Sequence, residues 1–218
     1  MNSDDIGKII RILRRESANW DVPVVTLEAE TSHDPFRVLI STVLSLRTKD
    51  ETTAEASRRL FGLADTPEKM LELPEREVIR AIYPVGFYRT KAKNILKICR
   101  DLIEKYYSRV PDDLDKLLQL KGVGRKTANL VLTLGYWKHG ICVDTHVHRI
   151  SNRLGYIDTR NPHQTEIELR KKLPKIYWIE YNSLLVAFGQ HTCRPVSPKC
   201  SLCPVEIYCE KAGVRKSR

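Results

Sequence analysis

Apolar residues recur at helical spacing along most of the chain. After Asp34 and Pro35, one apolar stripe comprises Phe36, Leu39, Ile40, Val43 and Leu44. Aspartate caps the first amides of a helix and proline fits its first turn, so a helix is predicted to begin here. A second stripe lies within residues 89–107 and comprises Ala92, Ile95, Leu96, Cys99, Leu102 and Ile103. We expect both stripes to be buried, with Cys99 as a small core residue.

The same spacing predicts helices in most other parts of the chain. They are expected near residues 6–13, 50–60, 68–73, 75–83, 125–134, 144–155, from 162 onward and 175–189. Residues 19–31 contain Pro23, several β-branched residues and no helical stripe, so they are predicted to form an extended connection. No segment alternates with a period of two over the length of a strand. The predicted fold class is therefore all-α.

Residues 118–135 read L-Q-L-K-G-V-G-R-K-T-A-N-L-V-L-T-L-G and place a tight turn between two apolar-periodic runs. Within the turn, Gly122 and Gly124 allow a positive φ and a close approach of the backbone to a ligand. The helix that begins at Arg125 directs unpaired amides the same way, which suits a phosphate. Lys126 lies just beyond the turn. We interpret this segment as a DNA-facing turn with a catalytic lysine attached.

Two other turns present residues that suit contacts with DNA. Residues 45–50 form a polar turn that contains Arg47, and residues 84–88 form a turn that presents Phe87. An arginine at a helix junction is able to enter DNA, although most exposed arginines are simply solvated. Phe87 is either an intercalating wedge or a packed core residue, and the sequence alone favours the core.

The charge balance favours a polyanionic partner. The 218 residues include 37 Lys and Arg against 27 Asp and Glu, which gives a net charge of +10. A basic surface also fits ordinary solvation, so charge alone decides little. No apolar run approaches the ~18 residues of a membrane span, and the N-terminus does not resemble a signal peptide. We expect a soluble, intracellular monomer, cytoplasmic or nucleoid-associated, with no membrane partner.

Four of the six cysteines lie close together in the spacing Cys193-x6-Cys200-x2-Cys203-x5-Cys209. A set this compact is able to hold one metal centre with thiolates alone. Zinc sites more often pair two short knuckles, and only one spacing here is short, so the pattern favours iron-sulfur and leaves structural zinc as the alternative. The metal would order a tail with few large apolar residues. Arg194 and Lys199, between the first two cysteines, suit either DNA phosphates or solvent.

The segment 120–129, the run Val143-Asp144-Thr145-His146 and the terminal cysteines occur in one chain. Together they resemble the endonuclease III family of helix-hairpin-helix DNA glycosylases. The turns at 44–50 and 85–88 also fall where that family has DNA-contacting loops. The resemblance implies two helical lobes flanking a cleft. Residues 28–138 would form a six-helix lobe with the hairpin motif, and residues 1–27 plus 139–218 a discontinuous lobe with a C-terminal iron-sulfur loop.

The resemblance also implies an activity. It is base excision repair, in which a DNA glycosylase with AP lyase (β-elimination) activity removes oxidised or otherwise damaged pyrimidines from duplex DNA. The partner would be double-stranded DNA with damaged bases or abasic sites. Lys126 would attack C1′ of the sugar, and Asp144 would stabilise the cationic sugar and help to manage protons. Asp144 fits an ordinary helix cap equally well.

Further roles follow from the same match. The cysteines would hold one [4Fe-4S] cluster. The hairpin would hold a phosphate, optionally with a monovalent cation. The residues expected to contact DNA are Gly122, Gly124, Arg125, Arg47, Phe87 and His146. The chain departs from the family pattern at three positions, because Arg47 replaces a glutamine that fills the gap left by the flipped base, Phe87 replaces a smaller aliphatic wedge, and Lys121 replaces a proline.

Two other functions fit the same residues. The first is a mismatch-specific, monofunctional glycosylase for thymine or adenine. Such relatives have a residue without an amine at the position of Lys126, so Lys126 argues for lyase activity. The second is a non-catalytic helix-hairpin-helix DNA-binding protein, in which Lys126 is a phosphate contact and Asp144 a cap.

Overall fold

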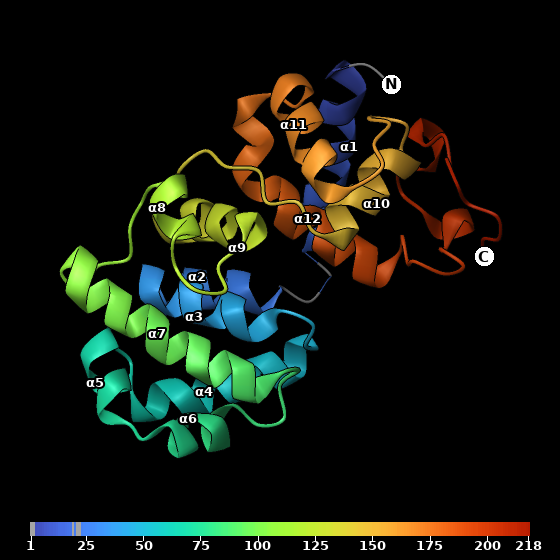
Figure 1. Cartoon of the computed structure of the whole chain (residues 1–218). Helices are drawn as coiled ribbons and strands as arrows, with labels where there is room; N and C mark the ends of the chain where they lie inside the picture. Colours follow the sequence, from blue (N-terminus) through green and yellow to red (C-terminus); the bar gives the residue numbers. More distant parts are fainter. Residues whose placement is uncertain (1–2, 19, 21–22) are drawn as a thin grey trace. The chain divides into compact units, whose positions relative to one another are not determined.

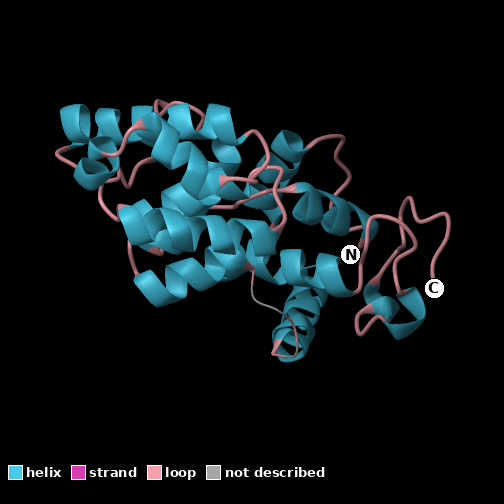
Figure 2. Ribbon diagram, turned by 90° about the horizontal axis from the view of Figure 1, so that it is seen from below, coloured by secondary structure: helices cyan, strands magenta, loops and turns pink. Residues whose placement is uncertain are grey.

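The computed structural model describes residues 3–18, 20 and 23–218. Within these ranges the chain forms helices and loops but no strands (Figure 2), which confirms the predicted all-α class. None of these helices combines the length and apolar character needed to cross a lipid bilayer. The chain divides into two compact units, one of residues 24–138 and one that joins residues 1–23 to residues 139–218. The assignment of residues 28–138 and of 1–27 plus 139–218 as functional lobes stays a prediction.

The 24–138 unit consists of helices joined by short loops (Figure 1). In chain order they are α2 (Val24–Ser32), α3 (Pro35–Ser45), α4 (Asp50–Leu63), α5 (Pro67–Glu72), α6 (Glu75–Ile82), α7 (Tyr88–Tyr106), α8 (Leu114–Leu118), α9 (Arg125–Leu130) and the π-helical η1 (Val131–Gly135). α3 is the centre of the unit, because it contacts α2, α4, α7, α9 and η1. Its residues 38–44 are all buried. This confirms the predicted stripe and extends burial around the helix, as expected for a helix surrounded by others.

The start of α3 follows the predicted capping pattern. Asp34 accepts a hydrogen bond at Oδ1 from Phe36 N at 2.8 Å, and Pro35 occupies the first helical position. The cap satisfies an amide that has no partner inside the helix. It therefore fixes where α3 begins.

The prediction of an extended connection over residues 19–31 is wrong from Val24 onward, because α2 occupies Val24–Ser32. Its β-branched residues lower its intrinsic helix propensity, and tertiary packing outweighs that preference. Val25, Thr26 and Ala29 are buried, and the helix packs on α3 and α4. Residues 19, 21 and 22 lie outside the described part of the chain.

The long helix α7 packs against α3, α5 and α6. Ala92, Ile95, Cys99 and Leu102 of the predicted inner stripe are buried, whereas Leu96 and Ile103 are half-buried. Burial raises the pKa of Cys99 to about 12. This thiol is therefore protonated at neutral pH and behaves as the small core residue that the sequence predicts.

The other unit has its own core. Its elements are α1 (Ser3–Ser17), α10 (Thr145–Arg153), α11 (Pro162–Lys172), η2 (Lys175–Tyr177), α12 (Trp178–His191), η3 (Cys200–Leu202) and η4 (Glu206–Tyr208). α12 is central, because it contacts α1, α10 and η2. The buried side chains of α1 that join this core are Ile6, Ile9, Ile10 and Leu13. They are the apolar positions that the sequence pattern places on one helix face.

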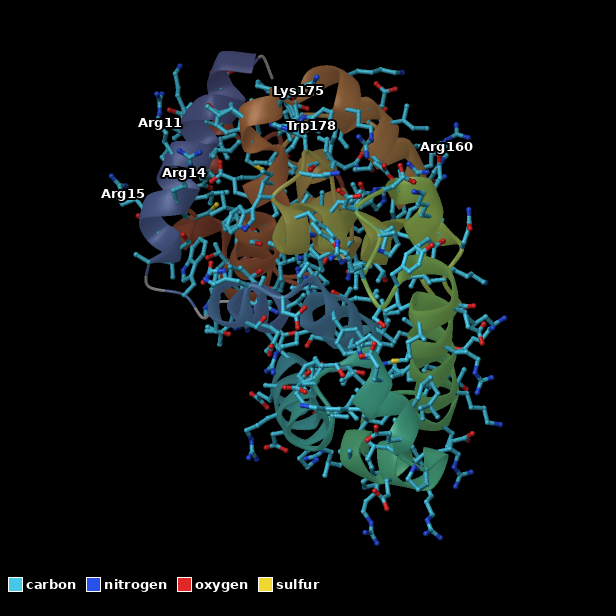
Figure 3. The ribbon with its side chains drawn as sticks, turned by 90° about the vertical axis from the view of Figure 1, so that its left-hand side faces the viewer. Arg11, Arg14, Arg15, Arg160, Lys175 and Trp178 are labelled. Carbon is cyan, nitrogen blue, oxygen red and sulfur yellow. The ribbon has the colours of Figure 1, made fainter. Side chains whose placement is uncertain are left out.

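The opposite face of α1 is basic. Arg11, Arg14 and Arg15 are exposed and project from the helix (Figure 3). Arg14 donates from Nε to Glu180 Oε2 at 2.7 Å, which ties α1 to α12. Because the pair is exposed, it contributes little to stability, and the apolar stripe carries the packing of α1.

Candidate functional site

The glycine hairpin between α8 and α9 is built as the sequence predicts. Leu120 and Val123 are buried on either side of the turn, and Val123 N donates to Leu120 O at 3.1 Å. Gly122 has a φ of +80°, and a β-carbon there would lie 2.6 Å from Asn94 Nδ2. The backbone conformation therefore favours glycine at this position, and the end of the Asn94 side chain in α7 would have to move to admit a β-carbon.

α9 begins at the end of this turn. Gly124 is its N-cap and supplies no side chain to the first amides of the helix. Arg125 is exposed and Lys126 is half-buried in the first turn. Asn129 donates from Nδ2 to Arg125 O at 3.0 Å, which holds that turn. The positive end of the helix dipole and its amides favour an anion beside Lys126.

The two predicted DNA-contacting turns meet within the 24–138 unit. Arg47 and Phe87 both have positive φ, 53° and 58°. The Arg47 guanidinium carbon lies 5.5 Å from the centre of the Phe87 ring. The prediction that Phe87 packs in the core is wrong, because 63% of the residue is exposed, whereas Val85 of the same turn is 1% exposed and fills the core. The sequence pattern did not show which apolar residue of the turn points inward.

Lys91 is buried beneath these turns, although it is not part of the apolar stripe predicted within residues 89–107. Its ammonium donates to Leu44 O at 2.7 Å, Leu46 O at 2.6 Å and Thr48 Oγ1 at 3.0 Å. Burial lowers the pKa of Lys91 to about 8, while the three acceptors favour the charged form. The spacing along the helix indicates this burial, because Lys91 precedes Ile95 by four residues and so lies on the same buried face.

The same contacts join the two turns to each other. Thr48 Oγ1 accepts from Lys91 and also from Gly86 N at 3.1 Å. A β-carbon at Gly86 would lie 2.5 Å from Arg47 O. The backbones of the two turns are therefore in close contact, and a larger residue at Gly86 would separate them. These backbone contacts fix the positions of Arg47 and Phe87 relative to each other.

Asp144 is the N-cap of α10. Its Oδ1 accepts from His146 N and Val147 N, each at 2.9 Å. The capping interpretation of Asp144 is thus confirmed, and the cap fixes the direction of the carboxylate. Lys126 and Asp144 belong to different units. Their joint action stays a prediction.

His146 is fixed by α10 and α12. Its Nδ1 lies 3.0 Å from Arg149 Nη2, and Arg149 also donates to Cys193 O at 2.9 Å. A β-carbon at Gly189 would lie 2.3 Å from His146 Nδ1, so glycine makes room for the ring. A contact of His146 with DNA stays a prediction.

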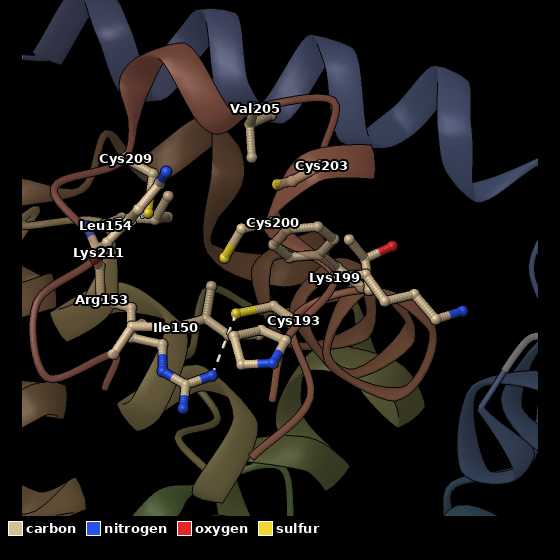
Figure 4. Close-up of a pocket in the computed structure, with 14 residues that line it drawn as sticks. Ile150, Arg153, Leu154, Cys193, Lys199, Cys200, Cys203, Val205, Cys209 and Lys211 are labelled. Atoms are coloured by element: carbon tan, nitrogen blue, oxygen red, sulfur yellow. Dashed lines mark hydrogen bonds between the residues drawn. The ribbon is translucent and has the colours of Figure 1, made fainter. Parts of the chain in front are cut away.

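The four clustered cysteines line one pocket (Figure 4). Arg153 Nη1 donates to Cys193 Sγ at 3.6 Å, and Lys211 N donates to Cys209 Sγ at 3.3 Å. Burial raises the pKa of Cys203 to about 11, so a bound metal would have to displace this proton to gain a thiolate ligand. Four sulfurs around one pocket, with cations at its edge, fit a thiolate-held metal centre. Within the described residues, however, no group of three or more His, Cys, Asp or Glu side chains is arranged so that it could hold a metal ion.

Arg194 and Lys199 lie in the loop between Cys193 and Cys200. Arg194 is exposed and donates from Nε to Gln190 O at 3.3 Å. Lys199 is half-buried and lines the cysteine pocket. Figure 4 shows the Lys199 side chain extending away from the four sulfurs. Contacts of either residue with DNA stay predictions.

Comparison with known proteins assigns this arrangement to a family. Residues 40–175 match the HhH-GPD superfamily base excision DNA repair protein family. Endonuclease III of Thermotoga maritima is 51% identical over 177 residues, which cover 81% of this chain and 83% of that protein. Endonuclease III of Escherichia coli is 37% identical over 204 residues, covering 94% and 95%.

The fold is similar to that of solved relatives. A trapped endonuclease III–DNA covalent intermediate is 33% identical and superimposes with a TM-score of 0.86, covering 97% of both chains. A thermostable thymine-DNA glycosylase, at 23% identity and a TM-score of 0.75, shares the fold. The chain belongs to the HhH-GPD superfamily of base excision DNA repair proteins and, within it, to the endonuclease III family.

Replacing Lys91 tests whether its ammonium holds the two turns. In Lys91→Met we expect the free energy of unfolding to fall by about 1–3 kcal/mol, because buried carbonyls lose their donor. Urea denaturation followed by circular dichroism measures this. Lys93→Met, at an exposed position of the same helix, should stay within about 0.5 kcal/mol of wild type. Equal stability of both variants and the wild type would show that the turns do not depend on Lys91.

Proposed function

We propose that the protein is a bifunctional DNA glycosylase and AP lyase that removes oxidised or otherwise damaged pyrimidines from duplex DNA. The observation that carries the proposal is Lys126, in the first turn of α9 directly after the Gly122–Gly124 hairpin. A hairpin alone supports binding, whereas an amine at this place supports chemistry on the sugar. The solved relative trapped as a covalent intermediate with DNA agrees with a nucleophilic mechanism.

Binding would begin with the DNA backbone. The hairpin and the N-terminus of α9 would hold a phosphate, with or without a monovalent cation, in a manner that ignores sequence. Arg47 and Phe87, stacked and exposed, would enter the gap left when the damaged nucleotide leaves the duplex. Arginine stacks on bases and hydrogen-bonds to them, and an aromatic ring wedges between them. Arg125, His146, Arg194 and Lys199 would add contacts to the phosphates.

The Lys126 amine would then attack C1′ of the flipped nucleotide. Its lone pair forms the N–C bond as the glycosidic bond breaks, and the base leaves with the bonding electrons and takes up a proton. Ring opening gives a Schiff base between Lys126 and the sugar. Loss of a proton from C2′ then expels the 3′ phosphate by β-elimination, and water releases the lysine.

Asp144 would support this reaction through its charge. The two backbone amides that bind Oδ1 fix the carboxylate, which would stabilise the positive sugar in the transition state and accept a proton. Because the carboxylate is already held in place, it needs little reorganisation during the reaction. The cap and the catalytic role are therefore compatible.

The cysteine pocket would hold one [4Fe-4S] cluster through Cys193, Cys200, Cys203 and Cys209. Such a cluster supplies a rigid, thiolate-linked centre when bound. The Arg153 guanidinium, which donates to Cys193 Sγ, would offset its negative charge, and the backbone amide of Lys211 would donate to Cys209 Sγ. The segment contains only short 3₁₀ turns, η3 and η4, so the metal would provide much of its order.

Borohydride trapping on duplex DNA with an abasic site tests the lyase. The wild type should form a covalent adduct, because hydride reduces the Schiff base, and Lys126→Ala should form none. Lys116→Ala, at an exposed position of α8 in the same unit, is the matched control and should trap normally. Absence of an adduct with the wild type would favour the mismatch-specific or non-catalytic alternatives.

Two substitutions at Asp144 separate its cap from its charge. Asp144→Asn keeps a capping side chain, so stability should change little while the rate of base removal falls by roughly 10²- to 10⁴-fold. Asp144→Ala should also lose about 1 kcal/mol of stability. Single-turnover base release and thermal unfolding measure the two effects. If Asp144→Asn were fully active, the residue would be only a cap.

Iron and sulfide analysis of anaerobically purified protein tests the cluster. The wild type should contain both elements, and Cys203→Ala should lose them together with the order of the tail. Cys99→Ala, a cysteine buried in the other unit, should keep full iron content. Zinc without iron in the wild type would contradict the assignment.

A further inference from the structure

The outer face of α7 and the hairpin together form a basic groove. It has a volume of about 580 Å³ and is lined by Arg89, Thr90, Lys93, Asn94, Lys97 and Lys121. Residues four apart on a helix share one face, so Arg89, Lys93 and Lys97 form a row. Four of the six lining residues are cationic and none is acidic. We call this site the α7 groove.

Most of this positive charge is uncompensated. Arg89, Lys93 and Lys121 are exposed, and within the described residues no carboxylate forms a salt bridge with any of them. Lys97 differs, because it lies 3.1 Å from Asp101, which also binds Lys105 at 2.8 Å. Three cations in one groove without counterions create a local positive potential that attracts an anion.

The groove is also fixed in place. α7 is a continuous helix of 19 residues. The Asn94 side chain of α7 packs on Gly122, where a β-carbon would lie 2.6 Å from Asn94 Nδ2, and Lys121 is the neighbour of that glycine. At the other end, Arg89 follows the exposed Phe87 by two residues. The α7 groove thus extends between the aromatic turn and the hairpin of the same unit.

The dimensions suit a nucleic acid backbone. From Arg89 to Lys97, eight residues at a rise of ~1.5 Å span about 12 Å. The phosphates of one strand of B-DNA rise by about 3.4 Å per nucleotide along the helix axis and follow an oblique path around it, so a row of this length reaches more than one consecutive phosphate. A small anion would engage one or two of the cations, whereas a strand would engage the whole row.

We propose that the α7 groove binds consecutive backbone phosphates of one DNA strand, between the phosphate held by the hairpin and the nucleotide beside Phe87. This proposal rests on the proposed function, which determines that the DNA strand runs from the hairpin towards Phe87. Arg89, Lys93 and Lys121 neutralise phosphates and make no base contacts. The groove therefore contributes affinity that does not depend on base sequence or on damage. It also tightens the binding of the strand that the turn with Phe87 distorts.

The test compares two triple variants with the same change in charge. The first is Arg89→Gln, Lys93→Gln and Lys121→Gln. The second is Arg58→Gln, Arg76→Gln and Arg80→Gln, at exposed positions on α4 and α6 of the same unit. Dissociation constants for an undamaged 25-base-pair duplex are measured by fluorescence anisotropy between 50 and 200 mM salt. Thermal unfolding confirms that both variants are folded.

We expect the groove variant to bind roughly tenfold or more weakly at low salt. The slope of log K against log salt should fall by about 2–3, one unit for each phosphate that the variant no longer neutralises. The control variant should keep a slope close to wild type. Ethylation of single DNA phosphates lowers binding where the protein contacts them. At the phosphates next to the one held by the hairpin, this effect should weaken in the groove variant only. Equal slopes in the two variants would overturn the proposal, because they would show an effect of net charge alone.

The measurement separates this proposal from the proposed function. Binding to undamaged duplex requires no chemistry, so a wild type that binds DNA but forms no borohydride adduct would refute the lyase and leave the groove testable. At saturating protein, the groove variant should still form the adduct, because Lys126 is intact. Loss of the adduct at saturation, with normal folding, would place the groove residues in the chemistry and contradict a backbone-binding role.

Discussion

The buried ammonium of Lys91 is the interaction on which the positions of the Arg47 and Phe87 turns depend. A buried charge destabilises a protein unless each of its donors is satisfied. Lys91 meets this condition with three acceptors, Leu44 O, Leu46 O and Thr48 Oγ1. Two of these are carbonyls at the end of α3, where a helix has no internal partners for them. One side chain thus terminates the central helix and holds the turn that carries Arg47.

α7 supplies three different surfaces from one rigid element. Lys91 points inward, Asn94 contacts Gly122 of the hairpin, and Arg89 and Lys93 line the outer groove. Functional residues are positioned most precisely when a helix rather than a loop carries them. Arg47, Phe87 and the hairpin lie on turns, but each turn is fixed by a contact with α7 or its N-terminus. The geometry of the unit therefore follows from the packing of this helix on α3.

The sequence predicts the features that depend on local chemistry. The cap and proline of α3, the hairpin glycines, the cap at Asp144 and the cysteine spacing are each determined by a few neighbouring residues. The features it missed depend on tertiary packing. α2 contains β-branched residues and forms only because α3 and α4 bury one of its faces. The burial of Lys91 and the exposure of Phe87 also follow from a neighbouring turn that no local pattern describes.

The cap at Asp144 accounts for a polar side chain at that position but not for its charge. Asparagine and serine cap helices about as well as aspartate. The two amides that bind Oδ1 would be satisfied by any of them. A carboxylate fixed at a helix start is favoured by the helix dipole, yet that benefit is modest and available at many helices. The mechanism proposed above would account for the charge at this position, because it creates a positive sugar, and it also uses the amine of Lys126.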